Sequence, residues 1–299
     1  MSSAISRRDF LALSTMGTAS LLLPWQKLLA EEVPETTLVL VRGGDATRAF
    51  HAAIEALGGI SQFNPKGHTV VVKPNIGWDR TPDQAANTDP ILVAAAVKTF
   101  KSAGSTVQVF DNTCNPAPLC YRRSGIEEAA KAAGAEVSLV REQRFDKVEL
   151  PEGVKIKNWP IYRDWLRADV RVNMPILKHH SLAGMTAGLK NLMGVMGGNR
   201  STIHNGFPEK LIDIAKPILP QLTVVDARRV LLRNGPTGGS LDDVKVMDAL
   251  IAGFDPVAVD AEAARLFGLD PTSLDYVVEA QRRGLGKIER PSGYREINL

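Results

Sequence analysis

The sequence predicts an α/β fold with a mostly parallel sheet and helices on both of its faces. Strand-like and helix-like segments alternate at short spacing, and most strand-like segments are continuous apolar runs. Such runs are typical of parallel strands, because both faces of a covered strand avoid water. The 299 residues, 44% hydrophobic and 23% charged, are sufficient to bury a core of this kind.

The first half of the chain supplies the clearest alternation. Residues 45–57 carry alanines at helical spacing and end at Gly58-Gly59, whereas VVVK and VQVF are compact strand-like runs. Asp89 and Pro90 suit an N-cap followed by proline at the first helical position. We therefore expect strands over residues 37–42, 68–73, 105–110 and 135–140, and helices over 45–57, 91–103 and 125–133.

Residues 147–165 interrupt this rhythm. The segments KVELP and VKIKNWP predict a small strand-rich excursion, after which the α/β alternation resumes at Asp169. We expect residues 31–299 to form a single α/β domain, with two lobes divided near residues 145–168 as the alternative. The second half is expected to contain strands over 169–175, 222–225 and 248–254, helices over 207–219, 256–267 and 273–283, and a polar tail.

The first thirty residues have the features of a targeting segment. Residues 6–11 (SRRDFL) resemble the twin-arginine export signal, and an apolar stretch follows to Trp25. This stretch is interrupted and shorter than the roughly 20 apolar residues of a membrane span. We expect a periplasmic or exported protein that engages the twin-arginine export machinery. The cleavage site near Ala30 is weak, so membrane retention by an uncleaved signal stays open, as does a plain basic tail before a hydrophobic helix.

Charge and cysteine content exclude several functional classes. The chain has a formal net charge of +3, of which the first thirty residues contribute +2, so the remainder is nearly neutral. A near-neutral body argues against nucleic acid as a partner. Cys114 and Cys120 could pair or stay free, but two cysteines are too few for a four-thiolate site, and no iron–sulfur cluster is expected.

Polar residues follow several predicted strands. In open parallel sheets ligands bind outside the carboxyl ends of the strands, so a shared sheet would place these side chains along one rim. Each residue alone suits a turn, a cap or a solvated surface equally well, and the rim interpretation rests on the whole pattern. The rim residues are Lys73, Asn75, Asp111, Asn173, Lys178, His179, Lys190, Asn191, His204 and Asp226.

The segment 169–204 contains the highest concentration of candidate functional side chains. It contains three of the five histidines, His179, His180 and His204, together with Lys178 and Lys190. Adjacent side chains in extended backbone point to opposite sides, so only one of the two neighbouring histidines faces the site, and we expect it to be His179. The lysines favour an anion such as phosphate or carboxylate, and a histidine suits a general base.

These residues are assigned three expected roles. Lys178, His179 and Lys190 are the candidate catalytic residues. Lys73, Asn75, Asn173 and Asn191 are the candidate ligand-binding residues. Asp111, His204 and Asp226 are candidate ligands of a divalent or transition metal. The sequence has no Walker P-loop, no dinucleotide fingerprint and no Gly-x-Ser-x-Gly elbow.

Several of these motifs, taken in order from about residue 37 to 270, resemble the family known as domain of unknown function 362. They are VVVKPN, VFDN, VNMPILKHH, TAGLKNLMG, VVDARRVLLRNGPTGG and FDPVAVDA. The resemblance implies emphasis on the rim residues without assigning their roles. Some relatives carry added ferredoxin-type cysteine clusters, which this chain lacks.

Two functional hypotheses follow, together with a bland alternative. The first is an exported enzyme that binds an anionic small molecule at the strand ends, with a metal as a further expectation. The second is a non-catalytic cofactor-binding or assembly protein of a periplasmic redox system. The bland alternative gives the polar stretch a purely structural role. The substrate, reaction and oligomeric state are not predicted.

Overall fold

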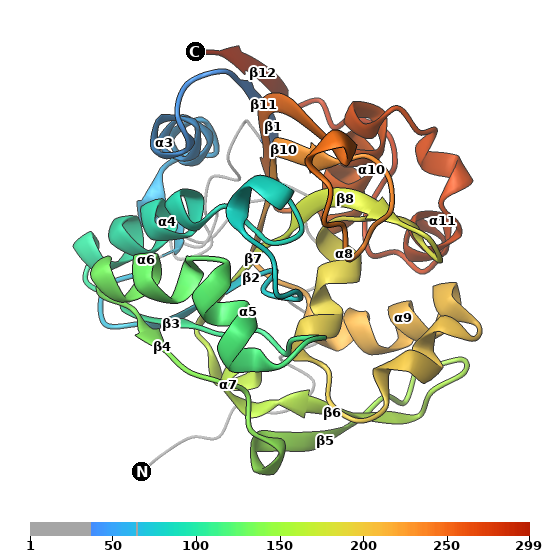
Figure 1. Cartoon of the computed structure of the whole chain (residues 1–299). Helices are drawn as coiled ribbons and strands as arrows, with labels where there is room; N and C mark the ends of the chain where they lie inside the picture. Colours follow the sequence, from blue (N-terminus) through green and yellow to red (C-terminus); the bar gives the residue numbers. More distant parts are fainter. Residues whose placement is uncertain (1–36, 64) are drawn as a thin grey trace, which may run out of the picture. The chain divides into compact units, whose positions relative to one another are not determined.

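A central sheet organises the structure, a computed structural model that describes residues 37–63 and 65–299 (Figure 1). The predicted signal segment, residues 1–30, lies outside the described residues. The described residues belong to one compact unit that spans Glu35–Leu299.

Ten strands of the described residues form one sheet, with the order β12-β1-β11-β10-β7-β2-β3-β4 and with β8 and β9 attached beside β10. The pairs among β10, β7, β2, β3 and β4 are all parallel, whereas β11 runs antiparallel between β1 and β10. The prediction of a mostly parallel sheet is confirmed. The strands are β1 (Leu38–Arg42), β2 (Thr69–Pro74), β3 (Thr106–Val109), β4 (Glu136–Val137), β7 (Val170–Met174), β8 (Ile176–His180), β9 (Gly184–Thr186), β10 (Leu222–Leu231), β11 (Val244–Gly253) and β12 (Tyr294–Asn298).

Helices cover both faces of the sheet. Figure 1 shows α3, α4 and α6 on one side and α10 and α11 on the other. The helices of the described residues are α3 (Ala46–Ala56), α4 (Pro90–Ser102), α5 (Ala117–Arg123), α6 (Ile126–Ala132), α7 (Arg163–Arg167), α8 (Gly188–Asn191), α9 (Phe207–Ala215), α10 (Pro256–Phe267) and α11 (Asp275–Arg282). Short 3₁₀ turns join several of them, including η2 (Pro82–Gln84), η4 (Leu192–Val195) and η5 (Arg200–His204).

Strand β2 explains why the apolar runs are continuous. Val70 and Val72 face the core formed with α3 and α4, and Val71 faces the opposite core formed with α9 and α10. Side chains alternate between the two faces of a strand, so the middle of a strand covered on both faces is apolar at consecutive positions. Each fully buried valine stabilises the fold by roughly 1.5–3 kcal/mol.

Aspartates cap the starts of three helices, including the start at Asp89 that the sequence predicted. Asp45 accepts a hydrogen bond from Arg48 N, and Asp89 accepts one from Ile91 N immediately before Pro90. Asp255 accepts from two first-turn amides at the start of α10. These carboxylates satisfy amides that have no partner within the helix. The caps fix where each helix leaves the sheet edge.

The strand-rich excursion is a two-stranded antiparallel hairpin, β5 (Phe145–Glu149) and β6 (Asn158–Tyr162), followed by α7. Ile161 forms a β-bridge with Met196, and Gly197 N donates to Pro160 O. The hairpin therefore holds the glycine-rich segment 194–198 in place. This segment lies over the ends of β2 and β3.

Several strands differ from the prediction. The C-terminal tail forms β12, which pairs in parallel with β1; a strand at a sheet edge accommodates exposed polar side chains, so composition concealed it. Strands β10 and β11 extend to ten residues each as a long antiparallel pair. Their outer halves carry exposed and partly buried charged residues, which have no apolar-run signal.

Pro175 separates β7 from β8. Strand β7 pairs with β2 and β10, whereas β8 no longer pairs with β2 and instead lies between β10 and β9. Proline has no N–H to donate to a neighbouring strand, so it suits the position where the chain leaves one ladder and joins another. This change of partner carries Lys178 and His180 past the end of the central sheet.

Candidate functional site

A cavity of about 490 Å³ lies at the carboxyl ends of the parallel strands. Six of the predicted rim residues line it: Asn75, Asp111, Lys178, Lys190, Asn191 and His204. They follow β2 and β3 or belong to β8, α8 and η5, so the fold joins segments that are far apart in sequence. This position agrees with the rule that ligands bind beyond the carboxyl ends of parallel strands.

Lys178 enters the cavity from β8. Its side chain is 1% exposed. Its Nζ donates to Asn75 Oδ1 at 3.1 Å and to Ala86 O at 2.5 Å, and it lies 6.0 Å from the centre of the Trp78 ring. No carboxylate in residues 37–63 and 65–299 forms an ion pair with it. Burial lowers the pKa of Lys178 to about 7.

Lys190 enters from α8. It is 9% exposed, and its Nζ lies 3.0 Å from Met193 Sδ and 5.6 Å from the centre of the Phe207 ring. A thioether is a weak acceptor, so this ammonium group has no strong internal partner among the described residues. Burial lowers the pKa of Lys190 to about 8.

Lys73 and Asp111 form an ion pair beneath the cavity. Lys73 Nζ lies 2.8 Å from Asp111 Oδ1, and both side chains are almost fully buried. Asp111 Oδ2 also accepts from Ile76 N at 2.6 Å, and Lys73 Nζ donates to Pro74 O at 2.9 Å. Burial lowers the pKa of Lys73, and the Asp111 charge partly offsets this effect. Asp111 is thus committed to an internal cation.

The backbone of Gly194 closes over this ion pair. A Cβ at this position would collide with Asp111 Oδ1 and would approach Lys73 Nζ within 2.6 Å. Gly194 O also accepts from Asn112 N at 2.9 Å. The first glycine of the GVMGGN run is therefore required by the close approach of its backbone to buried charges.

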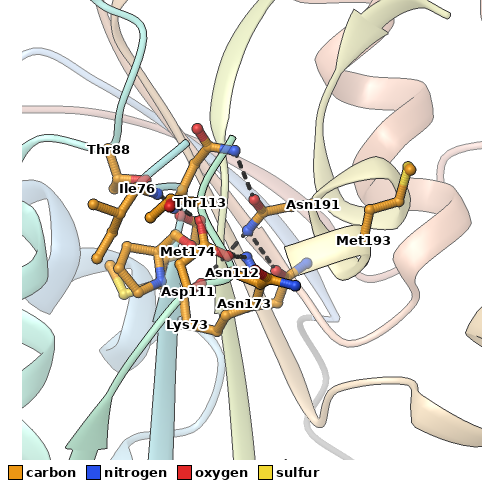
Figure 2. Close-up of polar contacts among 12 residues, drawn as sticks. Lys73, Ile76, Thr88, Asp111, Asn112, Thr113, Asn173, Met174, Asn191 and Met193 are labelled. Atoms are coloured by element: carbon orange, nitrogen blue, oxygen red, sulfur yellow. Dashed lines mark hydrogen bonds and ion pairs between the residues drawn. The ribbon is translucent and has the colours of Figure 1, made fainter. Parts of the chain in front are cut away.

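Three asparagines connect the lysine of β8 to α8, and Figure 2 shows two of them, Asn173 and Asn191, joined by a hydrogen bond. Asn75 Nδ2 donates to Asn191 Oδ1 at 3.0 Å, and Asn191 Nδ2 donates to Asn173 Oδ1 at 2.8 Å. Asn173 Nδ2 in turn donates to Gly188 O at 2.8 Å. Each amide donates in one direction and accepts in the other. Asn173 therefore lies behind the cavity wall and supports Asn191 instead of lining the cavity.

His180 and His204 form a histidine pair at the cavity wall. Their ring centres are 5.6 Å apart. His180 Nδ1 accepts from Leu182 N at 3.2 Å and from Ala183 N at 3.3 Å, so its proton in the neutral form resides on Nε2. Burial is the main cause that lowers the pKa of His180 to about 3, and it also lowers that of His204. Both imidazoles are therefore neutral near pH 7.

The expectation that His179 faces the site is wrong in its geometry. His180 lines the cavity, whereas His179 Nδ1 accepts from Gly235 N at 3.1 Å outside it. The reason is that residues 176–180 form a strand, in which Lys178 and His180 share one face and His179 points to the other. If Lys178 faces the site and residues 176–180 form a strand, side-chain alternation predicts that His180, two positions later, faces the site as well.

Asp226 also lies outside the cavity lining. Its carboxylate accepts from Asp89 N at 2.7 Å and from Arg228 N at 3.1 Å. Burial raises its pKa to about 6, and the neighbouring charge of Asp89 acts in the same direction. Of the predicted metal ligands, Asp111 and His204 line the same cavity and Asp226 does not, so the three are not brought together as one ligand set. Within the described part of the chain, no group of three or more His, Cys, Asp or Glu residues suits a metal ion.

Asp260 holds α8 in place from α10. This fully buried carboxylate accepts from Gly188 N at 2.6 Å and from Leu189 N at 3.1 Å, the first amides of the helix that carries Lys190 and Asn191. Burial raises its pKa to about 7. Asp260 therefore acts as a cap for a helix that lies 72 positions away in sequence.

Sequence reasoning missed several residues of the cavity wall. Arg200 donates to Asn112 O, Thr113 O and Met193 O, and so braces η5 against two other segments. Trp78, Cys114 and Thr186 also line the cavity, and no local motif marked them. Cys114 and Cys120 are both free, which leaves the Cys114 thiol facing the cavity.

The cavity therefore has an excess of positive charge. Its lining includes Lys178, Lys190 and Arg200, whereas Asp111 is the only carboxylate among the described lining residues. Lys73 neutralises Asp111 from below. Neutral imidazoles and asparagine amides make up much of the remaining polar lining. The arrangement favours an anion.

Comparisons with known proteins address the family and the fold. The model of the family described as "Domain of unknown function (DUF362)" matches residues 70–265. A curated relative, the thylakoid-associated protein sll1697 of Synechocystis sp., is 27% identical over 251 residues, which cover 81% of this chain and 76% of that protein.

A solved structure supports the fold class. The lactate racemase apoprotein from Thermoanaerobacterium thermosaccharolyticum matches with a TM-score of 0.50 and 15% identity, over 76% of this chain. The match covers 56% of the racemase chain. At this identity the likeness shows the α/β fold alone. None of the helices formed by the described residues is both long and apolar enough to cross a membrane.

Proposed function

Because this chain belongs to the DUF362 family, a family of unknown function, we infer its role from its own site. We propose that it is an enzyme that binds a small organic anion in the cavity and exchanges a proton with it. The observation that carries the proposal is the placement of two buried ammonium groups, Lys178 and Lys190, at one cavity without a carboxylate partner among the described residues.

Burial makes this placement costly without a ligand. Removing a charge from water disfavours the charged form, and the lowered pKa values of Lys178 and Lys190 express this cost. An anion bound between them would offset the cost and would restore both pKa values toward their ordinary range. Charge-assisted hydrogen bonds to carboxylate or phosphate oxygens supply the attraction.

The two histidines suit different tasks. His180 is a neutral N–H donor, because two backbone amides occupy its Nδ1. His204 Nδ1 is buried and accepts no hydrogen bond from the described residues, so this imidazole is the better proton acceptor. In the proposed step a proton moves from the ligand to a ring nitrogen of His204, and the electron pair of the broken bond stays on the ligand. Lys178, Lys190 and Arg200 stabilise the negative charge that develops.

Export is the second part of the proposal. It is supported by Arg7 and Arg8 ahead of an apolar stretch, and by the thylakoid association in the name of the Synechocystis relative. We propose that the twin-arginine export machinery carries the folded protein to the periplasm or beyond. Retention at the membrane by an uncleaved signal is the variant of this proposal that fractionation would reveal.

A divalent or transition metal remains a prediction. Because Asp226 lies outside the cavity lining and Asp111 is paired with Lys73, no step of the proposal involves a metal. Elemental analysis of the protein purified without chelators tests this prediction. A stoichiometric metal would mean that a different set of residues binds it. A metal-free protein would contradict the prediction of a bound metal.

Native mass spectrometry of the purified full-length protein, followed by extraction of any co-purified molecule, tests the function. We expect a small anion whose retention is lost in Lys178→Met. The identified molecule is then incubated with wild-type protein and with His204→Gln. Chemical conversion by the wild type alone supports the enzyme. Retention without conversion in both would support a non-catalytic carrier instead, and a neutral or cationic ligand would contradict the proposal.

A further inference from the structure

Lys178 and Lys190 approach the cavity from different walls. Lys178 belongs to β8 and is held by Asn75 Oδ1 and Ala86 O, next to the Trp78 ring. Lys190 belongs to α8 and is held by Met193 Sδ, next to the Phe207 ring. The two ammonium groups have no hydrogen-bonding neighbour in common among these contacts.

The asparagine chain keeps these two groups distinct. Lys178 is connected to α8 through the amide of Asn75 and then through that of Asn191. Asn191 is the neighbour of Lys190 in sequence, and Asp260 fixes the start of their helix through two backbone amides. Lys178 therefore cannot move far toward Lys190 without breaking buried hydrogen bonds, and the two contacts of Asp260 fix the backbone of the helix that carries Lys190. Buried polar groups left without partners are unfavourable, which opposes such a movement.

The positive charge of the cavity lining is compensated only by a ligand that carries more than one negative charge. When both lysines are protonated, Lys178, Lys190 and Arg200 contribute three positive charges, and the Lys73–Asp111 pair contributes none. Arg200 directs hydrogen bonds to three carbonyl groups, so it retains its full charge while bracing the wall. A ligand with a single carboxylate would leave one of the two buried ammonium groups without a counter-charge. An uncompensated buried charge is strongly unfavourable.

We propose that the ligand carries two anionic groups, one bound by Lys178 beside Trp78 and Asn75, and the other bound by Lys190 beside His204. The chemical class is a small dianionic acid, such as a dicarboxylate or a phosphorylated carboxylate. A volume of about 490 Å³ accommodates a molecule of this size. The inference rests on the proposed function, because it specifies the anion that the same cavity binds.

Two matched probes test the second anionic group. Succinate carries two carboxylates, and succinamate has the same carbon chain with one carboxylate replaced by a neutral amide. Their affinities for the full-length protein are measured by titration calorimetry at pH 6, where both lysines are charged and His180 is neutral. We expect succinate to bind at least about tenfold more tightly, since one charge-assisted contact is worth roughly that ratio.

Variants assign the two groups to the two lysines. Lys178→Met and Lys190→Met should each remove most of the preference for succinate over succinamate. Lys98→Met changes an exposed lysine on α4 and should leave the preference unchanged. Circular dichroism and thermal unfolding of each variant establish that the fold is retained. If a variant fails to fold, Lys178→Gln or Lys190→Gln is the substitute.

The outcomes separate this inference from the proposed function. Equal affinity for succinate and succinamate would overturn the two-anion inference while leaving an anion cavity in place. Binding of inorganic phosphate without any preference for succinate would have the same meaning. A failure of succinate, succinamate and inorganic phosphate alike to bind would contradict the anion cavity itself. A preference that survives in both lysine variants would also overturn the assignment.

Discussion

Lys73 Nζ lies 2.8 Å from Asp111 Oδ1 in a buried ion pair that follows two neighbouring parallel strands. This pairing neutralises the only carboxylate among the described residues that line the cavity. The other two lysines of the site, Lys178 and Lys190, are left without such a partner. One internal ion pair therefore determines the charge that the cavity presents to a ligand.

Lys73→Met should destabilise the fold strongly. The substitution removes the cation and leaves Asp111 buried with an uncompensated charge, at a cost of about 3–5 kcal/mol. Urea unfolding of wild type and variant measures this loss, with Lys98→Met as the exposed control. The double variant Lys73→Met with Asp111→Asn should recover part of the stability, because it removes the orphaned charge. A loss below about 1 kcal/mol in the single variant would contradict the role of the pair.

Gly194→Ala should also destabilise the protein, by about 1–3 kcal/mol, because the new methyl group meets the buried ion pair. Relief of the collision would require the segment 194–198 to move, so anion binding should weaken together with stability. Thermal unfolding and calorimetric titration with succinate measure both quantities. Unchanged stability would show that the backbone of Gly194 does not lie over the pair.

The pH dependence of stability should report the buried lysines. Their pKa values of about 7 and about 8 in the folded protein lie below the ordinary lysine value, so the unfolded chain binds more protons above pH 7. Stability without ligand therefore rises as the pH increases from 7 toward the unfolded value. The gain between pH 7 and pH 9, measured by urea unfolding, should be larger in wild type than in Lys190→Met. An equal gain in both proteins would exclude a lowered pKa for Lys190.

Export should depend on the arginine pair. Substitution of both Arg7 and Arg8 by lysine preserves the charge but removes the twin-arginine pattern. Fractionation of cells that produce each form should place the wild type in the periplasm or at the membrane and the variant in the cytoplasm. Identical distributions would contradict transport through the twin-arginine route.

Much of the fold could be predicted because continuous apolar runs mark the strands that are buried on both faces. Strand β2 buries valines on both faces, and Asp89 with Pro90 marks the start of α4 in the sequence itself. The edge strand β12 could not be predicted in this way. Its polar side chains face solvent, and its pairing with β1 depends on backbone contacts that composition does not encode.

The candidate cavity contains several residues that the sequence singled out. Strand ends pointed to Asn75, Asp111 and Lys178, the segment 169–204 supplied Lys190, Asn191 and His204, and the fold brings all six to one cavity. Whether His179 or His180 faces inward depended on recognising residues 176–180 as a strand, and Pro175 obscured this continuation. The contributions of Asp260 and Arg200 depend on contacts between distant segments, for which the sequence has no local signal.

The central claim is that Lys178 and Lys190 lack an internal counter-charge and receive one from a bound anion. The most direct measurement is the number of protons taken up when succinate binds at pH 7.5, obtained by calorimetry in buffers of different ionisation enthalpy. An anion should raise both lysine pKa values, so binding to wild type should take up protons, and the uptake should decrease in Lys178→Met and in Lys190→Met. Binding with no proton exchange, or with proton release, would contradict the account.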